Sequence, residues 1–267
     1  MLRSVALKSL RDARVGFAWW SLGLAGLVAL LVSVFPTVHD NPSLNKLVDD
    51  YPEALTAFLA FGGQVDYTSA AGYLGSELFS FMVPLLLMIA VIGAGAGAIA
   101  GEEERGTLEL LLANPMSRRR LVLEKAAAVA AEVVALGVVL LLALWVGARA
   151  VGMDISFGHL AAATTGAVLL ASVYGALAFL LGAATGRRSL AIGVTAAAAV
   201  AAYLVNGLAP LVDALDVPRK VSPFYHYTAS DPLRHGLEVS HSLVLVLVAA
   251  AFTLIAQEAF ARRDVSN

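Results

Sequence analysis

Six long apolar stretches alternate with more polar segments along this chain. They cover residues 17–35, 74–100, 121–148, 160–185, 190–212 and 242–259. The first holds 19 residues and would reach roughly 28 Å as an α-helix, which is close to the hydrocarbon thickness of a bilayer. The pattern therefore predicts an all-α membrane protein, in which residues 1–267 form a single transmembrane domain of six helices.

The composition supports a chain embedded in lipid. Hydrophobic residues make up 59% of the sequence and charged residues 14%, whereas an ordinary globular protein carries about 25% charged residues. The net charge of −2 is not the basic footprint of a protein that binds nucleic acid. The chain has no cysteine, which excludes disulfides, thiolate nucleophiles and cysteine metal sites.

The basic residues predict the orientation of the chain in the membrane. Six spans place both termini on one side, and if that side is the cytoplasm, 13 of the 18 lysines and arginines lie inside. These are Arg3, Lys8, Arg11, Arg14, Arg105, Arg118, Arg119, Arg120, Lys125, Arg187, Arg188, Arg262 and Arg263. The reversed topology would violate the positive-inside rule. We therefore expect both termini to be cytoplasmic.

Two polar segments have patterns of their own. In residues 1–16, cations interleave with apolar residues at helical spacing, as in a helix that lies in the inner interface; a plain topological anchor fits the same pattern. Prolines divide residues 213–241, outside the membrane, into pieces that keep apolar and aromatic side chains. This segment could dip into the protein, or its aromatic residues could anchor it at the headgroups.

Small residues recur in the second span. Gly93, Gly97 and Gly101 follow one another at intervals of four, which clears one helix face so that another backbone can approach closely. This contact could slide during gating, or it could be static packing.

The loop of residues 101–120, between the second and third spans, combines acidic, apolar and basic groups. Its acidic triplet, Glu102 to Glu104, suits the amino end of a helix, and Asn114-Pro115 would end that helix. Ser117 can cap the third span. The loop would then expose an apolar stripe on a short cytoplasmic helix, made of Leu108, Leu111 and Leu112. Such a helix suits docking into a groove of a cytoplasmic partner.

Two segments resemble those of a known family. Residues 101–118 are similar to the Glu-Glu-x-x-x-Gly-Thr-Leu-Glu-Leu-Leu-Leu-x-x-Pro-x-Ser-Arg signature of bacterial ABC-2 type transporter permeases, the membrane subunits of type V ABC exporters. A weaker match covers Ser222 to Tyr227, followed by Asp231, Leu233 and Gly236, and resembles the Ser-Pro-Phe segment of that family. Because the span number and loop lengths also agree, the resemblance covers nearly the whole chain.

The resemblance implies that two such subunits pair, as identical copies or as paralogues, and that each binds a cytoplasmic P-loop ATPase through a coupling helix in the loop 101–120. It assigns ATPase coupling to Glu102, Glu103, Glu104, Arg105, Gly106, Thr107, Leu108, Glu109, Leu111, Leu112, Pro115, Ser117 and Arg118. It assigns an outer gate, formed by short re-entrant helices, to Ser222, Pro223, Phe224, Tyr225 and Tyr227.

ATP and Mg²⁺ would bind to the partner. No glycine of this chain is followed by lysine, so the chain has no phosphate-binding loop of the Gly-Lys-Ser/Thr type. We therefore expect a transport subunit with no catalytic residue and no cofactor of its own.

Polar groups inside the spans are candidates for a translocation path. Glu132 lies about a third of the way into the third span, where a charge is costly unless it is paired or faces water. It could line an inner cavity or bind a cation, or it could be hydrated near the interface or pair with a neighbouring helix. Tyr174 and Asn206 are milder candidates for the same path.

Other chemistry has weaker support. The outer histidines His235 and His241, with Asp231 or Glu238, match no metal-site spacing, so we expect a solvated loop and no metal site. Serine, histidine and aspartate occur without a nucleophile elbow, which leaves a hydrolase without support.

These patterns favour the permease subunit of an ATP-driven exporter in the bacterial plasma membrane, moving a hydrophobic drug, peptide or lipid-like substrate. Two alternatives from the same family stay open: a sodium-type ion exporter, and an anchor that passes ATPase motion to a periplasmic partner. A solitary carrier would need more ionisable groups at mid-membrane and inverted repeats with broken helices, and the sequence shows neither.

Overall fold

The computed structural model describes residues 4–41, 66–108 and 117–263, and these residues form helices and no strand. Six helical runs are long and apolar enough to cross a membrane, as the sequence predicts. They are α1 (Val5–His39), the run of α4 (Ala70–Leu74), η1 (Gly75–Met82) and α5 (Val83–Ala98), α8 (Arg118–Ala150), α9 (Phe157–Thr185), α10 (Arg188–Leu208) with η2 (Ala209–Leu211), and α14 (Val239–Arg262).

All six spans begin before the predicted apolar stretches, in most cases because flanking polar residues extend the helices. Serine side chains accept hydrogen bonds from the first turns of α1, α8 and α9, among them Ser117, which accepts from the backbone N–H of Arg120. The predicted cap at Ser117 is therefore confirmed. Gly186, in a left-handed conformation with φ 68°, ends α9, and glycine adopts this conformation without steric cost.

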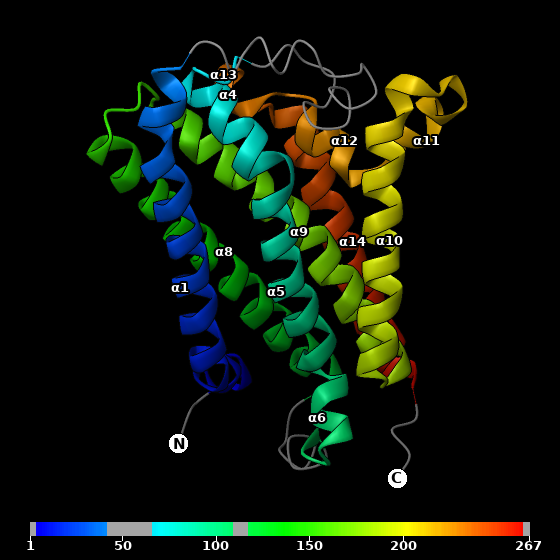
Figure 1. Cartoon of the computed structure of the whole chain (residues 1–267). Coiled ribbons are helices and arrows are strands. Elements are labelled where there is room, and N and C mark those ends of the chain that lie inside the picture. The colour runs from blue at the N-terminus through cyan, green and yellow to red at the C-terminus, as the bar shows by residue number, and fades with distance from the viewer. Residues whose placement is uncertain (1–3, 42–65, 109–116, 264–267) are drawn as a thin grey trace.

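The spans run side by side in one bundle (Figure 1). The start of α1 and the end of α14 lie at the same end of the bundle, which we call the N/C end, together with α6 (Ala100–Glu104). The opposite end, called the far end, carries the short helices that precede the last span. These are η3 (Asp213–Leu215), α11 (Asp216–Val221), α12 (Pro223–Thr228) and α13 (Pro232–His235).

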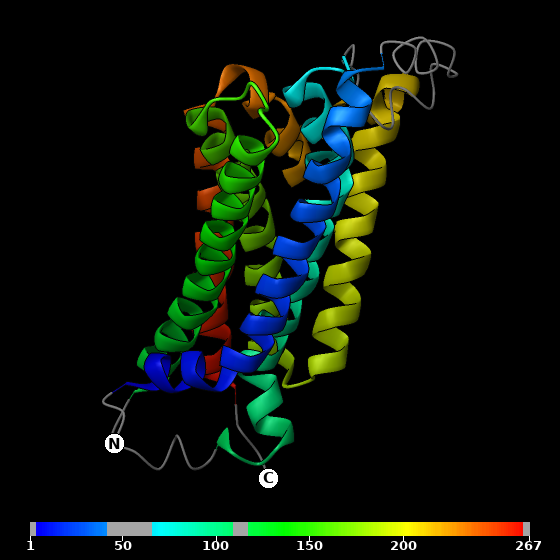
Figure 2. The same cartoon turned by 60° about the vertical axis from the view of Figure 1, so that its left-hand side comes forward.

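The first helix changes direction near the N/C end. Its first turns cross the end of the bundle, and the rest of α1 follows the bundle axis (Figure 2). The backbone N–H of Val5 donates a hydrogen bond to the Glu124 carboxylate of α8, with a distance of 2.6 Å between the nitrogen and Oε2. The segment 1–16 is therefore attached to the bundle at its start, and its placement in a membrane interface stays a prediction.

The closest helix contact involves a different glycine from those predicted. Both α5 and α14 pack along α9, and α1 packs along α8. A Cβ atom on Gly95 would lie 2.4 Å from the carbonyl oxygen of Gly175, so the backbones of α5 and α9 touch there. In contrast, a Cβ on Gly93 would meet nothing within 4 Å. Gly97 and Gly101 face only arginine side chains, so these three glycines make no close backbone contact with another helix among the described residues.

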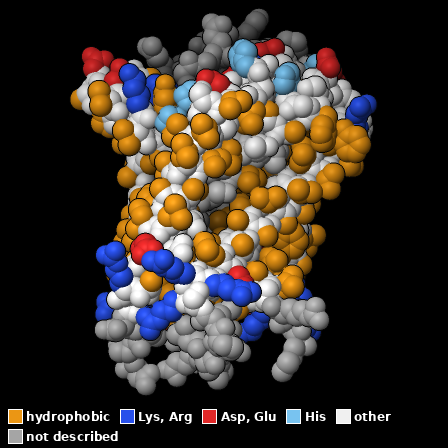
Figure 3. Space-filling view, turned by 180° about the vertical axis from the view of Figure 1, so that it is seen from behind, with side chains coloured by type: hydrophobic (Ala, Val, Ile, Leu, Met, Phe, Trp, Pro, Cys, Tyr) orange, Lys and Arg blue, Asp and Glu red, His pale blue; other side chains and the backbone are white. Residues whose placement is uncertain are grey.

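The outer surface has the polarity of a membrane protein. Hydrophobic side chains cover the middle of the bundle, Lys and Arg gather mainly towards the N/C end, and the histidines lie at the far end (Figure 3). Large apolar side chains are exposed along α1, α8, α10 and α14. Because lipid is as apolar as a protein core, such exposure is expected for helices that face a bilayer.

Candidate functional site

A groove of about 500 Å³ lies between α1, α5 and α8. Small residues of α5, including Gly93 and Gly97, form one wall, and the first half of α1 up to Trp20 forms another. Glu132 of α8 lines the groove. The structure therefore supports the first of the two interpretations of Glu132, in which the carboxylate faces a cavity.

The three residues predicted for a translocation path are not brought together. Tyr174 and Asn206 do not line the groove; both are buried, in α9 and α10. The Tyr174 hydroxyl and the Asn206 side-chain amide have no hydrogen-bond partner among the described residues. A single path through Glu132, Tyr174 and Asn206 is therefore not present in this conformation.

A buried ion pair lies at the N/C end of the groove. Lys125 of α8 donates to the Glu102 carboxylate of α6, and only 4% of the Lys125 side chain and 9% of the Glu102 side chain are exposed. Removing one partner of a buried pair leaves an uncompensated charge, whereas removing both is far less costly. The pair therefore links the segment after the second span to the third span.

The next carboxylate of the triplet contacts a different helix. Glu103 pairs with the guanidinium of Arg263, the residue that follows α14. Arg263 also donates to the carbonyl oxygen of Ala183 in α9, at a nitrogen–oxygen distance of 2.9 Å. A Cβ on Gly186 would lie 2.3 Å from the Arg263 guanidinium. Glycine at this position therefore both ends α9 and leaves room for the ion pair.

The third carboxylate contacts the fifth span. Glu104 accepts a hydrogen bond from the backbone N–H of Arg188, the first residue of α10, at 2.9 Å. A carboxylate at this position also interacts favourably with the positive end of the helix dipole. The three consecutive carboxylates thus contact α8, the end of α14 and the start of α10; we call these contacts the triplet network.

Glu102 and Glu103 lie in the first turn of a helix, as expected, but this helix ends at Glu104 and is not the longer coupling helix that the sequence predicts. The triplet lies on α6, which continues the second span after a break at Ile99, and Gly106 with φ 67° follows it. The side chain of Leu108 is also less exposed than expected. It is only 2% exposed and packs in a cluster with residues of α1, α8, α9 and α14. The predicted exposure of Leu108 for docking is therefore wrong.

The remaining residues assigned to ATPase coupling divide into two groups. Arg105 is exposed, and Thr107 donates to the carbonyl oxygen of Glu102 from both its backbone and its hydroxyl. Arg118 donates to the carbonyl oxygen of Arg263 at 2.6 Å, which adds a further contact to the end of α14. The others lie outside the described residues: Glu109, Leu111, Leu112 and Pro115.

The predicted outer-gate residues lie on α12 and insert into the bundle at the far end. Ser222 caps α12, and its hydroxyl donates to the carbonyl oxygen of Ala202 in α10 at 3.2 Å. The Phe224 side chain is 1% exposed, and its ring centroid lies 6.0 Å from that of Tyr174 and 5.4 Å from that of Tyr203. Phe224 and Tyr227 are thus buried within the protein, so the aromatic-belt interpretation does not hold for them.

Tyr227 supplies a hydrogen bond that the second span lacks. The run η1 is a π-helix, and at its end Val83 donates to Leu78, five residues earlier. The next donor in this pattern would be residue 84 to the carbonyl of Phe79, but Pro84 has no N–H. The Tyr227 hydroxyl donates to that carbonyl oxygen at 2.7 Å. The hydroxyl therefore satisfies a buried carbonyl and holds α12 against the second span.

Two histidines meet beside α12. The Nδ1 atoms of His226 and His241 are 2.8 Å apart, and His241 also lies 3.7 Å from the Glu238 carboxylate. Burial, and then the neighbouring His241, lower the pKa of His226, and a hydrogen bond to the Lys220 backbone opposes this shift. Among the described residues no group of three or more His, Cys, Asp or Glu is placed to hold a metal ion.

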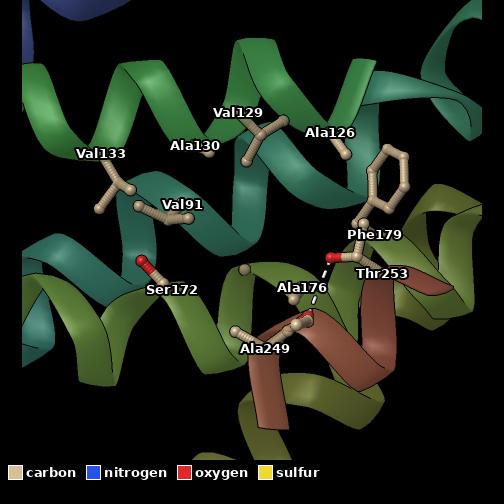
Figure 4. A pocket seen from close by; sticks show the side chains of 12 residues that line it. Val91, Ala126, Val129, Ala130, Val133, Ser172, Ala176, Phe179, Ala249 and Thr253 are labelled. Carbon is tan, nitrogen blue, oxygen red and sulfur yellow. Dashed lines mark hydrogen bonds between the residues drawn. The ribbon is translucent and has the colours of Figure 1, made fainter. Parts of the chain in front are cut away.

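A second cavity has a different character. It encloses about 160 Å³ between α5, α8, α9 and α14. Figure 4 shows that its walls carry mainly valine and alanine side chains. Its two hydroxyl groups, of Ser172 and Thr253, donate to carbonyl oxygens of their own helices. The cavity therefore offers a ligand little beyond apolar contact.

The sequence analysis missed three residues of these sites. Lys125 and Arg263 pair with the acidic triplet, and Trp20 lines the groove. A search for basic residues near the N/C ends of other spans would have found the first two, since opposite charges at the same membrane level are expected to pair. Nothing in the sequence pattern separates Trp20 from Trp19, which is exposed.

Comparisons with known proteins agree with the resemblance of the loop signature. A family model described as "ABC-2 family transporter protein" matches residues 3–265. An uncharacterized protein of Bacillus subtilis (strain 168), YhcI, is 25% identical to this chain over 270 residues, an alignment that covers 86% of this chain and 80% of YhcI.

Proposed function

The chain belongs to the ABC-2 family of transporter proteins, and from this premise we propose that it is the permease subunit of an exporter in the bacterial plasma membrane. It is a multi-pass membrane protein of a family whose members form the membrane part of transporters and typically work with an ATPase partner. In this proposal, a separate cytoplasmic ATPase binds ATP and Mg²⁺, two permease subunits pair, and the N/C end faces the cytoplasm.

The triplet network carries the proposal. The segment that resembles the family signature begins with three carboxylates that contact α8, α10 and the end of α14. Glu102 also lines the groove. A force applied to the loop that follows Gly106 would therefore reach α8, which borders the groove, and also α10 and the end of α14 through direct contacts. Coupling of this kind requires contacts that differ between two states, and ion pairs at the mouth of a groove can form in one state and separate in another.

The groove and α12 lie where a transporter needs an entrance for substrate and a closed outer gate. The groove lies between α1, α5 and α8 and reaches the N/C end, where Glu102, Arg105 and Lys125 line it, whereas Phe224 and Tyr227 are buried at the far end of the bundle. This arrangement suits a state that accepts substrate at the cytoplasmic half and is closed to the exterior. The groove favours a transport subunit over a simple anchor, which would need no cavity.

Copurification with the ATPase tests this function. Leu108 packs inside the chain, so the test changes the two leucines beyond it, Leu111→Asp together with Leu112→Asp. The double variant should reach the membrane in normal amount and lose most of the copurifying P-loop ATPase. Leu237→Asp, an exposed leucine at the far end, is the matched control and should retain the ATPase. Normal copurification by the double variant would contradict the docking role.

A transport assay separates an exporter from an anchor. Inverted membrane vesicles that contain the complex should accumulate an exported lipophilic substrate when ATP is added, and vesicles with the double variant should not. Copurification without accumulation would favour an anchor that passes ATPase motion to another protein.

A further inference from the structure

The charges that line the groove are distributed unevenly along it. Near the N/C end, acidic and basic side chains occur together, and the Glu102–Lys125 pair is among them. Glu132 lies seven residues beyond Lys125 on α8, which is about 10 Å further along a helix. Among the described residues that line the deeper part, Glu132 is the only charged one; the rest include Gly16, Trp20, Ile89, Ala90, Gly93 and Val129.

Glu132 has no partner of its own in this structure. Its carboxylate is partly buried and forms no ion pair or hydrogen bond with any residue that the structure describes. An ionised carboxylate at this depth is costly unless a cation or water compensates it. The deeper part of the groove therefore offers a carboxylate that no described side chain pairs with, set within apolar walls.

The side chains that line the deeper part of the groove favour an organic cation over an inorganic one. An inorganic cation such as Na⁺ or Ca²⁺ takes several oxygen ligands, but among the described residues that line this part of the groove only Glu132 carries a side-chain oxygen. An organic cation needs less, because one carboxylate neutralises the charge and apolar surface covers its body. Trp20 adds an indole ring, whose face attracts cations more strongly than other aromatic side chains.

The size and shape of the groove fit such a molecule. Its volume of about 500 Å³ falls in the range of pockets that hold drug-sized ligands, roughly 300–1,000 Å³. A Cβ on Gly93 would meet nothing within 4 Å, so the α5 wall is smooth at the level where a bulky body would lie.

We propose that the groove binds a lipophilic organic cation, with its amine or onium group against Glu132 and its apolar or aromatic body between α1 and α5. This inference rests on the proposed function, because it names the class of substrate. It disfavours the sodium-type alternative, because Glu132 would be the sole side-chain oxygen ligand at that depth.

Two ions of the same shape and opposite charge test the inference. Tetraphenylphosphonium and tetraphenylborate are titrated onto the full chain in lipid nanodiscs, without ATPase or nucleotide, and binding to empty nanodiscs is subtracted. The wild type should bind tetraphenylphosphonium saturably. Glu132→Gln should weaken this binding about tenfold or more, because the charge pair forms in an environment less polar than water, and it should not weaken tetraphenylborate binding.

Two further variants complete the design. Asp154→Asn removes an exposed carboxylate from the α8–α9 loop at the far end and should leave both affinities unchanged. Gly93→Leu fills the groove without changing its charge and should weaken binding of both ions. It also keeps the proposal testable if Glu132→Gln does not fold.

The outcomes separate this inference from the proposed function. No saturable binding of tetraphenylphosphonium to the wild type, equal binding by Glu132→Gln, or no effect of Gly93→Leu would each overturn the groove as a cation site. The nanodiscs contain no ATPase, so a failure of the ATPase to copurify would overturn the proposed function and leave this binding result intact.

Discussion

The hydrogen bond from Tyr227 to Phe79 gives the sharpest prediction. Tyr227→Phe removes only the hydroxyl and leaves the Phe79 carbonyl oxygen without a donor, because Pro84 cannot supply one. An unsatisfied buried carbonyl costs about 1–3 kcal/mol. Since Tyr227 is buried, we expect a loss of about 2 kcal/mol in the free energy of unfolding.

The loss of stability should depend on Pro84. Pro84→Ala restores a backbone N–H near the Phe79 carbonyl, so Tyr227→Phe should cost only about 0.5 kcal/mol in that background, a coupling of about 1.5 kcal/mol between the two sites. Tyr225→Phe is the matched control: the Tyr225 hydroxyl has no hydrogen bond to the described residues, so its removal should change stability by less than about 0.5 kcal/mol.

The measurement is unfolding of the four proteins in bicelles with increasing denaturant, followed by tryptophan fluorescence and analysed as a double-mutant cycle. Equal costs of Tyr227→Phe with proline and with alanine at residue 84 would refute the idea that the tyrosine replaces the missing donor. The hydrogen bond would then be an incidental contact of α12.

Three other predictions use the same unfolding assay. Gly95→Ala should cost about 2–3 kcal/mol because its Cβ would collide with a carbonyl of α9, whereas Gly93→Ala should be neutral or stabilising by up to about 1 kcal/mol; equal effects would contradict the packing. Lys125→Met should cost about 3–5 kcal/mol by leaving Glu102 buried and unpaired, and adding Glu102→Gln should recover more than half of this loss; additive losses would argue against a coupled pair. The pKa of His226 lies below its usual value of 6.5 in the folded protein. Between these two pKa values the unfolded chain binds more protons than the folded chain, so the free energy of unfolding decreases as the pH falls below about 6.5. His226→Gln should therefore reduce the loss of stability between about pH 7.5 and pH 5.5, and an unchanged loss would show that other groups cause it.

The sequence predicts the six spans well because span length and hydropathy are local properties. It predicts the direction of each helix face poorly. In a soluble helix the apolar face points to the core, but here lipid-facing and core-facing side chains are both apolar, so the pattern does not distinguish them. The spacing of Gly93 and Gly97 shows that they share a face, and only the packing of α5 on α9 shows that this face borders the groove.

The candidate sites were predictable only where their residues are close together in the sequence. The acidic triplet and the Ser222–Tyr227 segment were found from motif and composition. Their partners are far apart in the sequence, as with Lys125 and Arg263 for the triplet and Phe79 for Tyr227. Pairing at such distances depends on which helices become neighbours, and a single chain pattern does not specify this.

The triplet network has a mechanical consequence. Adjacent residues of one short helix attach to three elements that are distant in the sequence, namely the third span, the fifth span and the residue after the sixth. A pull on that helix is therefore divided among three attachment points and cannot displace one span alone. Loss of a single carboxylate would leave the other two attachments in place, so α6 would stay connected to the bundle even when one contact is removed.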